Sequence, residues 1–217
     1  MKRFGRIIGL LLAASMLLTL AACGENEKEK IAKLAYTWET MEYVEPDEAK
    51  DILEYFGFEE EELAYADLET MGFVRLMTLT ADKTYVQEYD VQKTCDYFRQ
   101  YFDSYIETLY THAAELTDVY SESIVEVEDA DEFRQFYAWL FDYDEYDEYL
   151  DDVVDEFVEI FELNDNLIER GTYELDKEKL KLKEEGSDTA EYVVYSVDDS
   201  TLTIEYSNDT EHYTRLG

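Results

Sequence analysis

The chain is poor in the residues on which catalysis and metal binding most often depend. Its 217 residues include two histidines, two cysteines and one proline. Neither His112 nor His212 lies in a serine–histidine–aspartate or cysteine–histidine pattern, and no cysteine–histidine cluster suits zinc. We therefore predict a protein that is not an enzyme and needs neither a cofactor nor a metal. A hydrolase built on two carboxylates is the catalytic alternative, although with 55 acidic residues two neighbouring carboxylates carry little information.

Basic residues are also scarce, with 18 lysines and arginines against 55 aspartates and glutamates. This balance excludes binding to DNA or RNA, because the chain lacks the cations that would neutralise phosphates. Strongly acidic chains are often disordered, but this one is 46% hydrophobic and 15% aromatic. That composition predicts a packed core.

Only one long uncharged run is present, and it lies near the N-terminus. The basic residues Lys2, Arg3 and Arg6 precede uncharged residues 7–22. This run of about 16 residues is shorter than the roughly 20 residues that a transmembrane helix needs. A basic start, an apolar run and small residues at its end are typical of a secretory signal. We expect residues 1–22 to be removed, which leaves 15 basic and 55 acidic residues and a formal net charge of −40.

Cys23 directly follows Leu20-Ala21-Ala22, and this tetrapeptide resembles the lipobox of bacterial lipoproteins. The resemblance implies a diacylglyceryl group on the Cys23 sulfur, with fatty acyl chains such as palmitate, and cleavage before Cys23. Two acyl chains anchor a protein stably, whereas one does not. We expect a lipid-anchored protein on the extracytoplasmic face of the cell membrane, with residues 23–34 as a flexible tether. A plain secretory signal followed by a chance cysteine is the alternative.

Once Cys23 carries lipid, only Cys95 remains, so no internal disulfide can form. Cys95 lies in an apolar helical stripe, and we expect it to be buried and unreactive.

Strand-like alternation occupies two separate parts of the chain. In residues 35–91 it predicts a strand over 37–44 and a hairpin over 72–89, with a short helix after Pro46. In residues 166–217, five short alternating segments are separated by tight turns. The strand over 37–44, the two strands of the hairpin and these five segments make eight strands. Eight antiparallel strands can close into a barrel that is filled by side chains or holds one small ligand.

Between the two strand regions, in residues 92–165, the apolar period changes to that of a helix. Apolar residues recur there at steps of three and four, which predicts a helical hairpin or a three-helix unit. Residues 95–161 hold 17 of the 33 aromatic residues, and residues 91–170 carry 24 acidic against four basic residues. An aromatic core beneath an acidic surface is the simplest interpretation. The alternative is that some aromatic side chains stay exposed, as a lid or a face that binds a partner.

Seven acidic residues at helical spacing share one face of this predicted helical region: Asp144, Asp147, Glu148, Asp151, Asp152, Asp155 and Glu159. We interpret them as a solvated face. Weak association with divalent cations such as Ca²⁺ is the alternative.

Several short segments resemble the small lipocalin-like domain of bacterial lipoproteins. They are Thr37-Trp38, residues 77–85, Gly171–Leu175 and Leu202–Ile204. The resemblance covers residues 36–89 and 167–216 and implies an α+β fold, an antiparallel β-barrel of about eight strands interrupted by the helical insertion. It also implies a barrel-closing contact between Trp38 and Arg215. Tyr36 stands where the family has glycine, and the insertion lies outside the family pattern.

We therefore expect an extracytoplasmic, non-catalytic module that binds a small apolar or aromatic ligand. The candidates for lining the barrel interior are Trp38, Tyr85, Tyr173, Tyr195 and Tyr206. The alternative is a filled barrel whose acidic, aromatic-rich insertion contacts a basic protein of the cell envelope. An empty barrel pocket of roughly 300 Å³ or more would distinguish the two.

Overall fold

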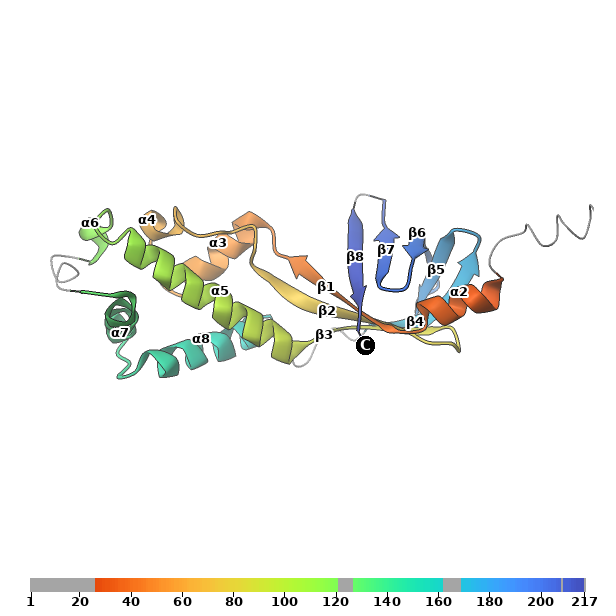
Figure 1. Ribbon diagram of the computed structural model, residues 1–217, viewed down its shortest axis with the longest axis horizontal. Helices are drawn as coiled ribbons and strands as arrows, with labels where there is room; N and C mark the ends of the chain where they lie inside the picture. The colour runs from red at the N-terminus through yellow and green to blue at the C-terminus, as the bar shows by residue number, and fades with distance from the viewer. Residues whose placement is uncertain (1–25, 121–126, 162–168, 208, 217) are drawn as a thin grey trace, which may run out of the picture. The chain divides into compact units, whose positions relative to one another are not determined.

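The computed structural model describes residues 26–120, 127–161, 169–207 and 209–216 (Figure 1). The predicted signal peptide 1–22, Cys23 and the predicted strand start at Leu167 lie outside the described residues. A search of the described helices found none with the length and apolarity needed to cross a membrane. The fold is α+β, as predicted: an antiparallel barrel of eight strands with a helical insertion between the third strand and the fourth.

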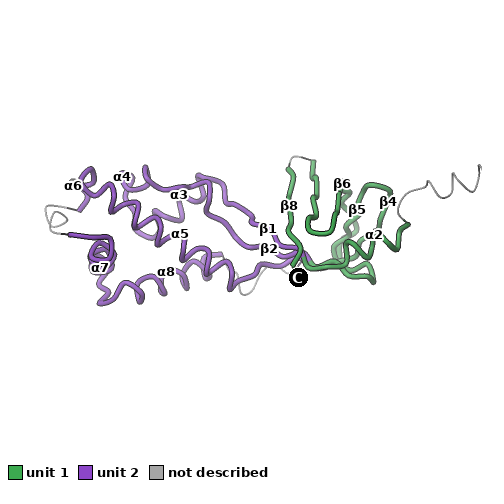
Figure 2. Tube along the Cα trace, viewed as in Figure 1, with its two compact units in different colours: residues 1–37, 78–85, 171–217 green, residues 38–77, 86–170 purple. Residues whose placement is uncertain are grey.

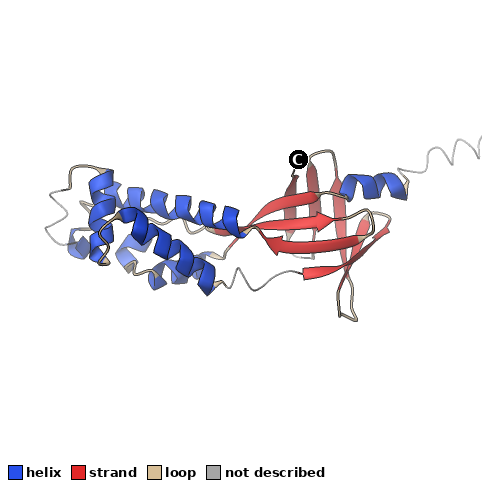
Figure 3. Cartoon of the chain, turned by 90° about the horizontal axis from the view of Figure 1, so that it is seen from below, coloured by secondary structure: helices blue, strands red, loops and turns tan. Residues whose placement is uncertain are grey.

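The strands form a barrel (Figure 3). The barrel is closed, and its strands follow one another in chain order. The Leu216 backbone N–H donates to the Thr37 carbonyl oxygen at 2.9 Å, which joins the end of the last strand to the start of the first. The strands are β1 (Thr37–Tyr43), β2 (Gly72–Leu79), β3 (Thr84–Tyr89), β4 (Glu169–Asp176), β5 (Lys179–Glu184), β6 (Glu191–Val197), β7 (Thr201–Glu205) and β8 (Thr210–Arg215).

The alternating pattern in the sequence becomes a buried layer inside the barrel. The register places Tyr173 opposite Leu182. Ile204 lies opposite Tyr195, and Leu202 opposite Tyr213. All six side chains are buried, whereas polar neighbours on the same strands face solvent. Strict alternation therefore sets which face of each strand points inward.

The insertion consists of α5 (Val91–Thr111), α6 (Thr117–Tyr120), α7 (Ala130–Leu140) and α8 (Tyr146–Ile160). Helix α5 packs against both α7 and α8, which also contact each other. Before the insertion, α3 (Pro46–Tyr55) and α4 (Glu60–Leu63) join β1 to β2. Pro46 opens α3 and Gly57, with φ +91°, follows its end, as the sequence predicts.

Residues 27–34 differ from the prediction of a flexible tether, because they form helix α2 (Glu27–Leu34). The Asn26 side chain accepts a hydrogen bond from the Glu29 backbone N–H at 3.0 Å. In return, the Glu29 carboxylate accepts one from the Asn26 backbone N–H at 3.3 Å. This reciprocal cap satisfies two donors at the start of the helix, and Leu34 is buried at its end.

The described residues form two compact units (Figure 2). The barrel unit comprises the described parts of residues 1–37, 78–85 and 171–217, and the helical unit comprises those of 38–77 and 86–170. Strands β1 to β4 contribute residues to both units. The helical unit has an aromatic-rich core, as the simplest interpretation of the sequence predicts.

Candidate functional site

Three tyrosines on α5 share one face of that helix. Tyr97, Tyr101 and Tyr105 are spaced by four residues, so they lie one above another. The Tyr97 hydroxyl donates to the Thr70 carbonyl oxygen at 2.5 Å, which ties α5 to the segment that follows α4.

A pocket of about 380 Å³ lies between this helix face and that segment. Its size falls within the usual range for small-molecule sites. It is lined by Tyr65, Asp67, Thr70, Tyr97, Gln100, Tyr101, Ser104, Tyr105 and Thr108. We call it the tyrosine pocket. All its lining residues belong to the helical unit.

Two hydroxyls of the tyrosine pocket, those of Tyr101 and Tyr105, are buried and have no hydrogen-bond partner among the described residues. Only 4% of Tyr105 is exposed. A buried polar group without a partner costs about 1–3 kcal/mol. A tyrosine hydroxyl is protonated at neutral pH and can donate, and burial raises the pKa of these two further above the ordinary value of 10.0. A ligand or a water molecule that reached them would remove this cost.

The charge in the tyrosine pocket has one sign. Asp67 is the one charged residue that lines it, and no lysine, arginine or histidine does so. Burial is the main cause that raises the pKa of Tyr101, and the negative charge of Asp67 adds to it. Asp67 therefore lies close enough to act on the buried hydroxyl electrostatically.

The rim of the pocket is held by Tyr65. Its ring stacks on the His112 imidazole, with ring centroids 4.1 Å apart and 21° between the planes. Its hydroxyl donates to Glu115 Oε2 at 2.8 Å. The sequence gives no catalytic pattern around His112. In the structure this residue stacks on Tyr65 beside the pocket but does not line the pocket.

Behind Tyr105 lies Glu62, a carboxyl with only 2% of its surface exposed. Its Oε1 atom accepts hydrogen bonds from the hydroxyls of Tyr120 and Tyr137, the latter at 3.3 Å. Its Oε2 atom accepts one from the Glu59 backbone N–H at 2.7 Å. Burial raises the pKa of Glu62 despite these stabilising hydrogen bonds. The Glu62 charge also contributes to the raised pKa of Tyr105, which places the two groups near each other.

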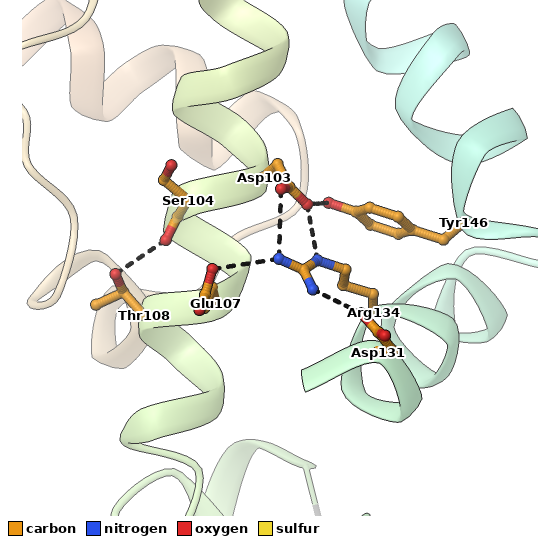
Figure 4. Close-up of polar contacts among 7 residues, drawn as sticks. All are labelled: Asp103, Ser104, Glu107, Thr108, Asp131, Arg134 and Tyr146. Carbon is orange, nitrogen blue, oxygen red and sulfur yellow. Dashed lines mark hydrogen bonds and ion pairs between the residues drawn. The ribbon is translucent and has the colours of Figure 1, made fainter. Parts of the chain in front are cut away.

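A second pocket, of about 580 Å³, lies around Arg134 on another side of α5. The Arg134 guanidinium binds Asp103, Glu107 and Asp131 (Figure 4). The Tyr146 hydroxyl donates to Asp103 Oδ1 at 3.2 Å. Both arginines that line this pocket are paired, Arg134 with these three carboxylates and Arg99 with Asp151, so neither is left to bind an anionic ligand.

The five predicted barrel-lining residues lie in or near the barrel strands, and none of them lines either described pocket. Trp38, Tyr85, Tyr173 and Tyr195 are buried, and Tyr206 is half-buried. The Tyr173 hydroxyl donates to the Thr80 carbonyl oxygen at 2.7 Å. Their role in binding a ligand stays a prediction.

The resemblance to the lipocalin-like domain predicts a contact between Arg215 and Trp38. In the structure Arg215 makes a cation–π contact with Tyr36, two residues before Trp38. The guanidinium carbon lies 3.2 Å from the centroid of the Tyr36 ring. Tyr36 occupies the position where the lipocalin-like pattern has glycine, so the larger side chain here supplies the contact surface.

Among the described residues, no group of three or more histidine, cysteine, aspartate or glutamate side chains is arranged to hold a metal. Several carboxylates of the acidic face of α8 have other partners. Arg99 binds Asp151, the Tyr143 hydroxyl donates to Asp152, and the Tyr55 hydroxyl donates to Glu156. Cys95 is half-buried, and burial raises the pKa of its thiol.

Interpretation of the sequence alone missed the tyrosine pocket. Its signal in the sequence is the four-residue spacing of Tyr97, Tyr101 and Tyr105, of which only Tyr105 belongs to the predicted apolar stripe. Comparison of the chain with family models, curated proteins and solved structures found no match in any of the three.

Proposed function

We propose that this protein is a membrane-tethered, non-catalytic binding module whose ligand site is the tyrosine pocket. The carrying observation is Tyr105, which lines the pocket and whose buried hydroxyl has no partner among the described residues. A hydroxyl in that position favours any occupant that completes its hydrogen bonding.

The burial of the barrel interior supports placing the ligand in the helical unit. Leu180, Leu202, Ile204 and Tyr213 have no exposed surface, and Tyr173 has 1%. A cavity wide enough for a ligand would leave such side chains accessible from within. In this proposal the barrel is a structural support and the helical unit carries the binding site.

The tether in this proposal is the lipid on Cys23, and the protein is an extracytoplasmic lipoprotein with a lipocalin-like barrel. The lipobox-like Leu20-Ala21-Ala22-Cys23 sequence and the closed eight-stranded barrel support it. At a formal net charge of −40, an anionic membrane surface would repel the mature chain, so attachment requires the lipid.

Native mass spectrometry of the full chain, purified from the cells that produce it, tests the ligand site. We expect a bound small molecule that is retained by the wild type and lost from Tyr105→Phe, which keeps the ring and removes the hydroxyl. Tyr55→Phe is the matched control, because Tyr55 is 60% exposed and does not line the pocket. Equal retention by all three proteins would refute the tyrosine pocket as the site.

A basic protein of the cell envelope is the second candidate ligand. Trp139 and Leu140, at the end of α7, are 62% and 50% exposed on a unit rich in acidic residues. Exposed tryptophan is common at the centre of protein interfaces. Crosslinking from position 139 in cells should capture a protein if this surface is used, whereas crosslinking to lipid or to nothing would reject this candidate.

A further inference from the structure

We propose that the occupant of the tyrosine pocket is a small organic ammonium ion. This inference rests on the proposed function and adds the chemical class of the ligand. It follows from the charge of the pocket lining, from its aromatic rings and from the unpartnered hydroxyls of two lining tyrosines.

The charge of the lining selects against anions. Asp67 is its one charged residue, and the buried Glu62 lies behind Tyr105. In the sequence, residues 91–170, which include α5, carry 24 acidic against four basic residues. An anion placed here would face carboxylates with no cation to match it, which raises the free energy of binding. A cation gains from the same field.

The lining also offers the groups that hold an ammonium ion. Four of its nine residues are tyrosines, whose ring faces attract cations. The oxygen atoms of the Tyr101 and Tyr105 hydroxyls are buried and have no donor among the described residues, so an N–H or O–H group of a ligand that reaches them can donate to them. Asp67 supplies a carboxylate of opposite charge.

The hydroxyls also set a requirement beyond charge. Because each tyrosine hydroxyl donates as well as accepts, a ligand with its own acceptor near the cationic group satisfies both functions. An amino alcohol meets this requirement, and the pocket of about 380 Å³ has room for one. A neutral polyol could meet the hydrogen bonding but gains nothing from Asp67.

Calorimetric titration of the full chain, in a polyoxyethylene detergent that carries neither sugar nor choline, tests the class. The probes are choline, ethanolammonium and 3,3-dimethyl-1-butanol, the neutral molecule with the shape of choline. We expect choline or ethanolammonium to bind, and choline to bind at least about tenfold more tightly than its neutral counterpart. High salt should narrow this difference.

Substitutions test separately whether the ligand binds in the tyrosine pocket and whether its positive charge matters. Asp67→Asn should weaken binding of the cation about threefold to tenfold and leave the neutral probe unchanged. Tyr105→Phe should weaken binding of the cation by a similar factor, while Tyr55→Phe should leave this binding unchanged.

Each failure has a distinct meaning. If choline and its neutral counterpart bind equally well and both are weakened by Tyr105→Phe, the pocket stands and the ammonium class is wrong. If neither ammonium probe binds wild-type protein, the ammonium class is also overturned. If a probe binds but neither Tyr105→Phe nor Asp67→Asn changes its affinity, both the class and the proposed site are overturned.

Discussion

The Arg134 guanidinium donates to both carboxylate oxygens of Asp103, from Nε at 2.7 Å and from Nη2 at 3.3 Å (Figure 4). This two-point contact connects α7 to α5 in a unit where cations are scarce. Since Glu107 and Asp131 bind the same guanidinium, one basic residue offsets the repulsion of three acidic ones.

Arg134→Leu should therefore lower the free energy of unfolding by about 1–2 kcal/mol at low salt, the range for a network of partly exposed pairs. The loss should shrink at high salt, because salt screens the repulsion among the carboxylates that remain. Urea denaturation at low and high salt measures both effects.

The matched control is Arg170→Gln, which also removes one positive charge from the helical unit but at an exposed position. We expect it to change stability by less than about 0.5 kcal/mol. A loss equal to that of Arg134→Leu would mean that net charge, not the Asp103 contact, stabilises the unit.

The buried Glu62 predicts an unusual dependence of stability on pH. Burial raises its pKa in the folded protein above the ordinary value of 4.5. Between these two pKa values the folded state binds more protons than the unfolded chain, so this group's contribution to stability falls as pH rises through the window. Each unit of the shift corresponds to about 1.4 kcal/mol.

Glu62→Gln cannot titrate, and its side-chain oxygen can still accept from Tyr120 and Tyr137. As the pH rises from the ordinary value of 4.5 towards neutral, its free energy of unfolding should therefore fall less than that of the wild type. Chemical denaturation across this range measures the difference. Glu60→Gln removes an exposed acid from the same short helix and should keep the wild-type slope. Parallel curves for wild type and Glu62→Gln would contradict the raised pKa.

The sequence predicted the barrel because inward and outward positions alternate locally. In β7, Leu202 and Ile204 alternate with polar residues, and the structure buries both of them. Helix α2 could also have been predicted, since Asn26 and Glu29 have the spacing of a capping box. The charged composition of residues 27–34 instead favoured the prediction of a flexible tether.

The tyrosine pocket could be predicted only in part. The spacing of Tyr101 and Tyr105 places them on one face of α5, but spacing cannot show whether a hydroxyl finds a partner. That depends on how residues 65–70 pack against the helix, which is a contact between segments distant in the sequence. For the same reason, alternation predicted which side chains enter the barrel but not whether they fill it.

Lipid attachment at Cys23 predicts a direct chemical signature. Cells grown with labelled palmitate should incorporate the label into wild-type protein but not into Cys23→Ala, which has no sulfur to modify. Cys95→Ala is the matched control and should keep the label, because Cys95 is half-buried within the folded chain. Label in the Cys23→Ala protein, or its absence from the wild type, would rule out the proposed anchor.

Near the start of β4, the structure leaves no room for a side chain at Gly171. A Cβ atom there would lie 2.2 Å from the Lys183 carbonyl oxygen and 2.6 Å from a ring carbon of Tyr85. Gly171→Ala should lower the free energy of unfolding by about 1–3 kcal/mol, because the paired strand β5 must move away. Thermal or urea denaturation measures the loss, and Thr172→Ala, at the exposed neighbouring position, should show little change.

A second substitution shows which of the two contacts limits the size of residue 171. Tyr85→Val removes the ring but leaves the Lys183 carbonyl, which belongs to the backbone. In the Gly171→Ala background, Tyr85→Val should therefore not restore wild-type stability, and it adds the cost of an emptied core position. If the double variant were as stable as the wild type, the ring would set the limit. If Gly171→Ala alone were fully stable, the close approach of β4 and β5 at this point would be wrong.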